Sequence, residues 1–169
     1  MLGIRIRKAE ISDAPRMADI ARQAWESGIM PIVPDGRDTR EAERRRLSRA
    51  AGEGWSHAIV AEINGFVAGW CSRMPGRSYI PFLFVAPDMQ GHGLGTMLLE
   101  RMESMLELEG AERVHLETPA DHVRAVRFYE RQGYRILALR PNGGGRRDPF
   151  TSVHLEKRLS PYEGDIDED

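Results

Sequence analysis

The sequence is poor in cysteine, and it has no apolar run long enough to cross a membrane. Cys71 is the only cysteine in 169 residues, which excludes an intrachain disulfide and is typical of a protein of the reducing cytoplasm. No apolar segment approaches the roughly 20 residues of a membrane span, and the N-terminus has no signal-peptide core. We therefore expect a cytoplasmic protein with no membrane partner.

Metal ions and nucleic acids are not expected as ligands either. The five histidines are scattered without the spacing of metal ligands, so no metal site is predicted. The positive charge is almost all arginine, because Lys8 and Lys157 are the only lysines, yet the formal net charge is -2. A chain with that balance has no general basic footprint for nucleic acid.

The composition that remains is that of a globular domain. Hydrophobic residues make up 41% of the chain and charged residues 30%. No linker or internal repeat divides it. We expect one domain over residues 1–160, followed by a solvated acidic tail over residues 161–169.

Hydrophobic periodicity and turn residues predict an α/β (α+β) fold. Asn64-Gly65 is the strongest hairpin signal, and it separates two strands of alternating pattern. Helices interleave with antiparallel hairpins, which favours one mixed, mostly antiparallel sheet of about six to seven strands flanked by about four helices. The predicted strands are 3–8, 57–63, 66–73, 79–85, 113–118, 134–139 and 151–158, and the predicted helices are 13–25, 37–51, 93–109 and 121–132.

A glycine-rich turn stands between the fourth predicted strand and the next helix. It reads Gln90-Gly91-His92-Gly93-Leu94-Gly95. Such a turn presents unpaired amides and the positive end of the helix dipole, which together suit phosphate oxygens. A P-loop is excluded because no Gly-Lys-Ser/Thr follows, and a dinucleotide fingerprint is excluded because its third glycine would fall on Thr96 or Leu98. A glycine turn without a ligand stays the alternative.

Two blocks resemble the GCN5-related N-acetyltransferases (GNAT). Gln90-x-x-Gly93-x-Gly95, after a strand ending in Val85-Ala86-Pro87, resembles the family's acetyl-CoA pyrophosphate loop. The resemblance extends over about residues 3–158 and has one departure, His122, where the family often has asparagine. The second block lies downstream and is similar to the family's next helix at Ala125, Phe128, Tyr129, Glu130, Gly133 and Tyr134.

The resemblance implies acetyl-CoA as cosubstrate and acetyl transfer to a primary amine by direct attack in a ternary complex. A backbone N–H near Val85 would polarise the thioester carbonyl, and Tyr129 would protonate the departing thiolate. The residues implied in cofactor binding are Phe84, Val85, Gln90, Gly91, His92, Gly93, Leu94, Gly95, Thr96, His122, Ala125, Phe128 and Tyr129.

The base is less defined than the acid. Glu117 lies twelve residues before Tyr129, the spacing of a base candidate in similar ribosomal-protein N-terminal acetyltransferases. Alternation along the strand turns Glu117 and His115 away from Val114 and Leu116. Two alternatives stay open. Glu117 is a surface carboxylate and an ordered water is the base, or Tyr129 is only a half-buried aromatic residue of its helix.

The acceptor is expected to be a small-molecule amine or a peptide N-terminus. Similar enzymes build the acceptor pocket from two loops, here residues 25–36 and 140–150, and the second carries Arg146 and Arg147. A homodimer is consistent with the family. Two alternatives remain: a silent acyl-CoA-binding sensor of the same fold, and a nucleic-acid-binding domain using the arginine-dense helix 37–49, which the net charge disfavours.

Overall fold

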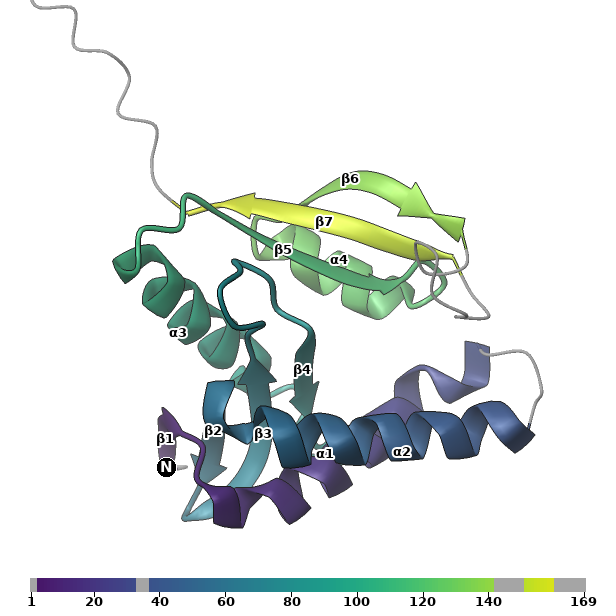
Figure 1. Cartoon of the computed structure of the whole chain (residues 1–169), viewed down its shortest axis with the longest axis vertical. Coiled ribbons are helices and arrows are strands. Elements are labelled where there is room, and N and C mark those ends of the chain that lie inside the picture. Colours follow the sequence, from purple (N-terminus) through teal and green to yellow (C-terminus); the bar gives the residue numbers. More distant parts are fainter. Residues whose placement is uncertain (1–2, 33–36, 142–150, 160–169) are drawn as a thin grey trace, which may run out of the picture.

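A computed structural model describes residues 3–32, 37–141 and 151–159, without the side chains of residues 37–39. The Arg146–Arg147 segment and the acidic tail therefore lie outside the described residues. Within them the order is β1 (Ile4–Lys8), α1 (Ala14–Gly28), α2 (Arg37–Gly54), β2 (Ala58–Ile63), β3 (Phe66–Ser72), β4 (Phe82–Val85), α3 (Leu94–Leu108), β5 (Arg113–Pro119), α4 (Val123–Arg131), β6 (Arg135–Arg140) and β7 (Ser152–Arg158) (Figure 1).

The strands form two antiparallel sets. The first has the order β1-β2-β3-β4 and the second the order β5-β7-β6. An isolated parallel bridge between Tyr79 and His115 joins the sets. The predicted fold class is confirmed. Among the described residues, this bridge is the parallel pairing that makes the sheet mixed. Because no other pairing links β4 to β5 in the described part of the chain, the two strands separate beyond it (Figure 1).

Local signals account for the turns. Asn64 and Gly65 have φ of 50° and 85°, as the predicted two-residue hairpin requires. Several predicted boundaries were wrong. The strand predicted over 79–85 begins at Phe82, and the helix predicted over 37–51 ends at Gly54. His122, not Asp121, precedes the first residue of α4, because the His122 carbonyl accepts the first helical bond, from Val126 N–H at 3.1 Å.

Two hydrophobic cores cover opposite faces of the first sheet. On one face α3 packs through residues such as Leu98 and Met102, both fully buried, and this core continues to the second sheet and α4. On the other face α1 packs through Met17 and Trp25, and the polar helix α2 contributes Leu47 and Ala51. Among the described residues, no helix is long and apolar enough to span a membrane.

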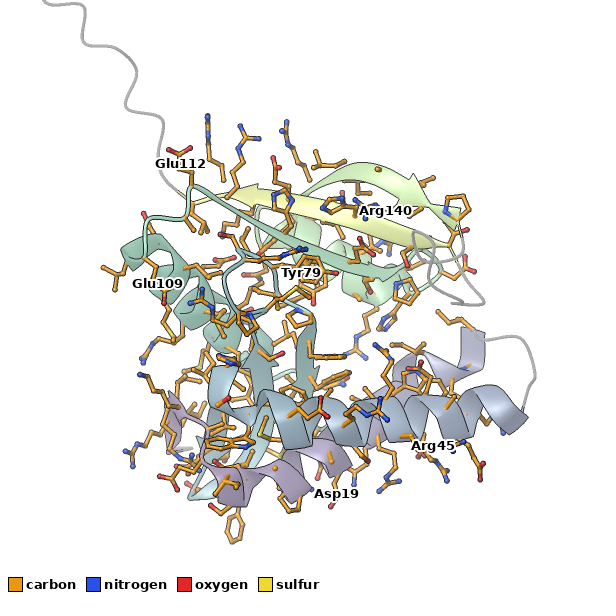
Figure 2. All side chains as sticks on the ribbon, viewed as in Figure 1. Asp19, Arg45, Tyr79, Glu109, Glu112 and Arg140 are labelled. Carbon is orange, nitrogen blue, oxygen red and sulfur yellow. The ribbon has the colours of Figure 1, made fainter. Side chains whose placement is uncertain are left out.

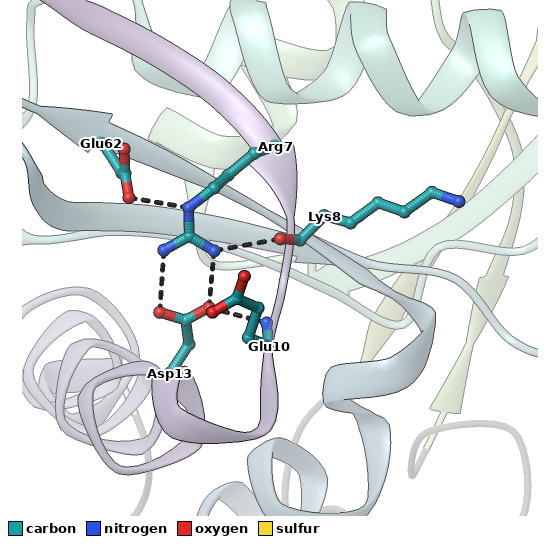
Figure 3. Close-up of polar contacts among 5 residues, drawn as sticks. All are labelled: Arg7, Lys8, Glu10, Asp13 and Glu62. Atoms are coloured by element: carbon teal, nitrogen blue, oxygen red, sulfur yellow. Dashed lines mark hydrogen bonds and ion pairs between the residues drawn. The ribbon is translucent and has the colours of Figure 1, made fainter.

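A polar cluster fastens the N-terminal strand to the start of α1 (Figure 3). Arg7 donates from Nε to Glu62 at 2.7 Å and from Nη1 to Asp13 at 2.7 Å, while Asp13 accepts the Glu10 N–H at 2.7 Å. The Arg7 guanidinium holds the pKa of Asp13 below its ordinary value. The cluster holds β1, β2 and α1 in register, away from the separation of β4 and β5.

Candidate active site

The free edge of β4 is the centre of the site. Ala86 N–H donates to Ala68 O at 2.8 Å, which makes that pair a hydrogen-bonded one. Antiparallel ladders alternate hydrogen-bonded and non-bonded pairs, so the next pair, Val85 with Gly69, is non-bonded. The Val85 N–H and C=O therefore point away from β3, towards the gap where β5 has separated.

Gln90 completes this edge. Its side-chain Nε2 donates to the Val85 carbonyl at 3.3 Å. The carbonyl of Val85 is thus satisfied, whereas its N–H faces the gap. A donor in that position suits a carbonyl oxygen that gains negative charge during a reaction.

The glycine turn stands at the start of α3 and has a backbone conformation that favours glycine. Gly91 and Gly93 have φ of 82° and 79°, which side chains rarely adopt, and a Cβ on either would meet no atom within 4 Å. Gly93 is the N-cap residue of α3, and its carbonyl accepts the first helical bond, from Met97 N–H at 3.0 Å. The N–H groups of the first turn before Met97 have no intrahelical acceptor, so they present a positive helix end to the open side of the turn.

His92 and Thr96 support the turn with their side chains. The Nδ1 atom of His92 lies 3.2 Å from the carbonyls of Met89 and Gln90, so the imidazole folds back onto its own loop. Thr96 Oγ1 accepts a hydrogen bond from Gln132 Nε2 at 3.1 Å, which ties α3 to α4.

A groove of about 400 Å3 runs from the glycine turn between α3 and α4. A Cβ on Gly95 would lie 3.4 Å from the Phe128 ring, so the small residue lets the two helices approach at the groove floor. Predicted cofactor residues line this groove at Val85, Gln90, Gly91, Gly93, Leu94, Gly95, Thr96, His122, Ala125, Phe128 and Tyr129.

A second cavity, of about 440 Å3, opens on the opposite side, under α1 and α2, and is called the acceptor-side cavity below. Phe84 lines it, as do Trp25 and Ile29 of the predicted acceptor segment. The residues that line both cavities are Leu83, Val85, Gln90, His122, Arg124, Ala125 and Tyr129. The two cavities therefore meet at the free edge of β4.

Tyr129 stands at this junction. Its half-buried ring packs edge-on against Phe128 and Tyr134, at centroid distances of 5.2 and 5.6 Å. Burial raises the pKa of Tyr129, and the neighbouring Cys71 and Tyr79 raise it further. The phenol is therefore protonated at neutral pH, the state that a general acid needs.

His122 closes the junction on the side of α1. A Cβ on Gly28 would come within 3.1 Å of the His122 Nε2, so the imidazole lies directly against the end of α1. Desolvation lowers the pKa of His122, and Arg124 lowers it further, which favours the neutral ring at pH 7. His122 can still donate or accept a hydrogen bond where the family often has asparagine.

Glu117 lines the acceptor-side cavity, as its strand position predicts, but it has a partner. Arg140 Nη1 lies 2.9 Å from Glu117 Oε1. Arg140 also contacts His154 at 2.9 Å, and His154 in turn contacts His115 at 3.1 Å. Figure 2 shows Arg140 on the second sheet and Tyr79 close to β5. The contact with Arg140 therefore occupies one of the two carboxylate oxygens of Glu117.

The structure brings together all the predicted site residues except one. His92 lines neither the groove nor the second cavity. Sequence reasoning missed Arg46, Arg124 and Tyr79, which line the acceptor-side cavity. Arg124 directly precedes Ala125 of the second family block, whereas nothing in the sequence distinguishes Arg46 from its arginine neighbours. The roles assigned to these residues remain predictions.

The comparisons with known proteins decide the family. Residues 15–134 match the model of the acetyltransferase (GNAT) family. The chain belongs to the GNAT family. Its curated relatives include an acetyltransferase of Pectobacterium atrosepticum, 34% identical over 47% of this chain and 57% of the relative. An uncharacterized N-acetyltransferase of Methanocaldococcus jannaschii is 38% identical over 48% of this chain and 54% of the relative. The chain thus matches about half the length of these relatives.

Solved structures share the GNAT fold over nearly the whole chain. The PaiA N-acetyltransferase of Thermoplasma acidophilum, in complex with coenzyme A, has a TM-score of 0.77 at 17% identity, covering 92% of this chain and 99% of that one. The ribosomal-protein-S18-alanine N-acetyltransferase of Escherichia coli has a TM-score of 0.71 at 21% identity, covering 97% and 99%. At these identities the likeness establishes the fold.

Proposed function

We propose that the protein is an acetyl-CoA-dependent N-acetyltransferase that acts on a primary amine. The observation that carries the proposal is the meeting of two cavities at the free edge of β4, one leading to the glycine turn and one to α1 and α2. Acetyl-CoA would enter from the glycine turn and the amine from the other side. Direct transfer needs both reactants in one ternary complex, and the two separate approaches permit it.

The chemistry follows from the groups at the junction. The deprotonated amine attacks the thioester carbonyl, and the resulting oxyanion accepts the hydrogen bond of Val85 N–H. Collapse of the intermediate breaks the C–S bond, and Tyr129 gives its proton to the leaving sulfur. The nitrogen, which became positively charged in the attack, then loses a proton, and this proton returns Tyr129 to the phenol. Acetyl-CoA supplies the acyl group when bound, and the residues of the glycine turn and the first turn of α3 would hold its pyrophosphate.

The amine loses its proton to water or to Glu117. Arg140 Nη1 already occupies Glu117 Oε1 at 2.9 Å, so we assign the proton to an ordered water. Glu117 would then attract the protonated amine and orient it towards the carbonyl. The acceptor class in this proposal is a small-molecule amine or a peptide N-terminus.

The test is release of free thiol from acetyl-CoA in the presence of a panel of primary amines and short peptides. The proposal predicts thiol release that depends on acceptor, with one acetyl group added to the amine by mass spectrometry. Binding of acetyl-CoA without thiol release from any acceptor would instead favour a silent acyl-CoA-binding domain. Absence of binding would remove both possibilities.

A further inference from the structure

We propose that the acceptor carries an anionic group about 10 Å from its amine, roughly three extended residues away, and that Arg46 of α2 binds this group. The inference rests on the proposed function and deepens it. It concerns the acceptor-side cavity, where apolar rings and one arginine lie along β4.

The wall of this cavity is aromatic. Phe82 and Phe84 stack with centroids 5.8 Å apart and an interplanar angle of 23°, and Trp70 supports both rings from the core, at 5.8 and 5.4 Å. Ile29 lines the same cavity from the end of α1. An apolar body of the acceptor would therefore lie over the two phenylalanine rings.

Arg46 is held in place at the far end of this wall. Its Cζ atom lies 5.5 Å from the centroid of the Phe82 ring, and Nε and Nη2 bind both carboxylate oxygens of Glu43 at 2.8 to 3.0 Å. Glu43 thus occupies one edge of the guanidinium, and no described residue accepts a hydrogen bond from Nη1 on the other edge. A pre-oriented arginine of this kind suits a carboxylate or phosphate.

The charged side chains of the cavity are Arg46, Arg124 and Glu117. Arg124 also lines the groove and so lies at the junction, whereas Glu117 lies on β5 and Arg46 lies over the beginning of β4. An acceptor with an ammonium group and an anion at its two ends would match Glu117 with the first and Arg46 with the second.

The spacing sets the length of the acceptor. Val85 lies three positions after Phe82, which corresponds to about 10 Å along a strand that rises about 3.3 Å per residue. A free α-amino acid is too short to reach from the junction to Arg46. An extended tripeptide, at about 3.3–3.6 Å per residue, places its terminal carboxylate at about the right distance from its amine.

The test compares Ala-Phe-Ala with its C-terminal amide, and alanine with alaninamide, as acceptors in the thiol-release assay. The wild type should show a kcat/KM about tenfold higher for the tripeptide acid than for its amide, as expected for one charged hydrogen bond. Alanine and alaninamide should show no such preference, because they are too short. Arg46→Gln should remove the preference by raising the KM of the acid alone.

Two further variants locate the effect. Arg45 on the same helix is 75% exposed and pairs with Glu41 at 3.8 Å, so Arg45→Gln should keep the preference. Arg77 lines a neighbouring cavity of about 380 Å3 with Arg140 and His154, and this cavity shares Tyr79 and Glu117 with the acceptor-side cavity. A preference that survives Arg46→Gln and disappears in Arg77→Gln would overturn the proposal and move the anion site there.

Failure of this inference is distinguishable from failure of the proposed function. Two outcomes would overturn the role of Arg46 alone. In the first, the acid and the amide of the tripeptide react at equal rates. In the second, neither is turned over by a protein that binds acetyl-CoA and acetylates another amine. No thiol release with any amine would contradict the proposed function itself.

Discussion

The two sides of the β4 edge differ in what they are made of. The side of α3 and α4 presents backbone: glycines at positive φ and the free amides of a helix terminus. The side of α1 and α2 presents side chains, among them Phe82, Phe84 and Arg46. Backbone recognition requires glycine at fixed spacing and therefore leaves a motif in the sequence. Recognition by side chains from several separate elements leaves no such motif.

The largest expected effect is on Tyr129, the residue at which both cavities would meet the reacting groups. Tyr129→Phe should lower kcat about a hundredfold, the usual contribution of a general acid, with the Kd of acetyl-CoA unchanged by calorimetry. Tyr134→Phe is the matched control, because Tyr134 donates to buried Glu103 at 2.7 Å and lines neither cavity. Equal losses of kcat in the two variants would show that Tyr129 acts only through packing.

A change remote from both sides should alter stability and nothing else. Asp13→Asn breaks the pair with Arg7 and should lower the free energy of unfolding by about 3 kcal/mol, measured by urea denaturation. The KM values for both substrates should stay the same.

The same cluster gives a pH dependence. Because the folded pKa of Asp13 lies below its ordinary value of 3.8, its contribution is fully present above that value and is lost as the pH falls through the folded pKa. The gap in stability between wild type and Asp13→Asn should therefore narrow below about pH 4. A gap that stays constant down to pH 2 would contradict this assignment.

A smaller effect separates the two roles open to Glu117. As an orienting group, Glu117→Gln should raise the acceptor KM several-fold with little change in kcat. As the base, it should lower kcat about tenfold or more. Arg140→Gln is the companion variant, because it removes the 2.9 Å partner and keeps the carboxylate of Glu117. This variant is expected to retain activity if Glu117 itself orients or deprotonates the amine.

The smallest effect concerns the support of the edge itself. Gln90→Leu removes one 3.3 Å hydrogen bond to the Val85 carbonyl, worth about 1 kcal/mol. We expect a several-fold increase in the KM of acetyl-CoA and little change in the acceptor KM. A change in the acceptor KM that exceeds the change in the acetyl-CoA KM would mean that Gln90 contacts the acceptor.

The sequence predicted the features that depend on the local backbone and missed those that depend on contacts between distant side chains. The Asn64-Gly65 hairpin, the apolar face of α1 and the glycine turn depend on local backbone rules, and the structure has all of them. The pairing of Glu117 with Arg140 joins residues from β5 and β6, and no local pattern indicates it. Arg46 stands in a helix rich in arginine, and only the fold places it over Phe82.

The glycine turn offers the most direct test of the central claim, that backbone amides on the α3 side hold acetyl-CoA. Gly93 and Gly110 lie at opposite ends of α3 with φ of 79° and 94°, and a Cβ on either would meet no atom within 4 Å. Gly93→Trp and Gly110→Trp therefore impose similar backbone strain, and circular dichroism checks that both variants fold. Calorimetric titration with acetyl-CoA and desulfo-CoA should show binding by the wild type and Gly110→Trp, and none by Gly93→Trp. Unchanged binding by a folded Gly93→Trp, or no binding by the wild type, would contradict the account.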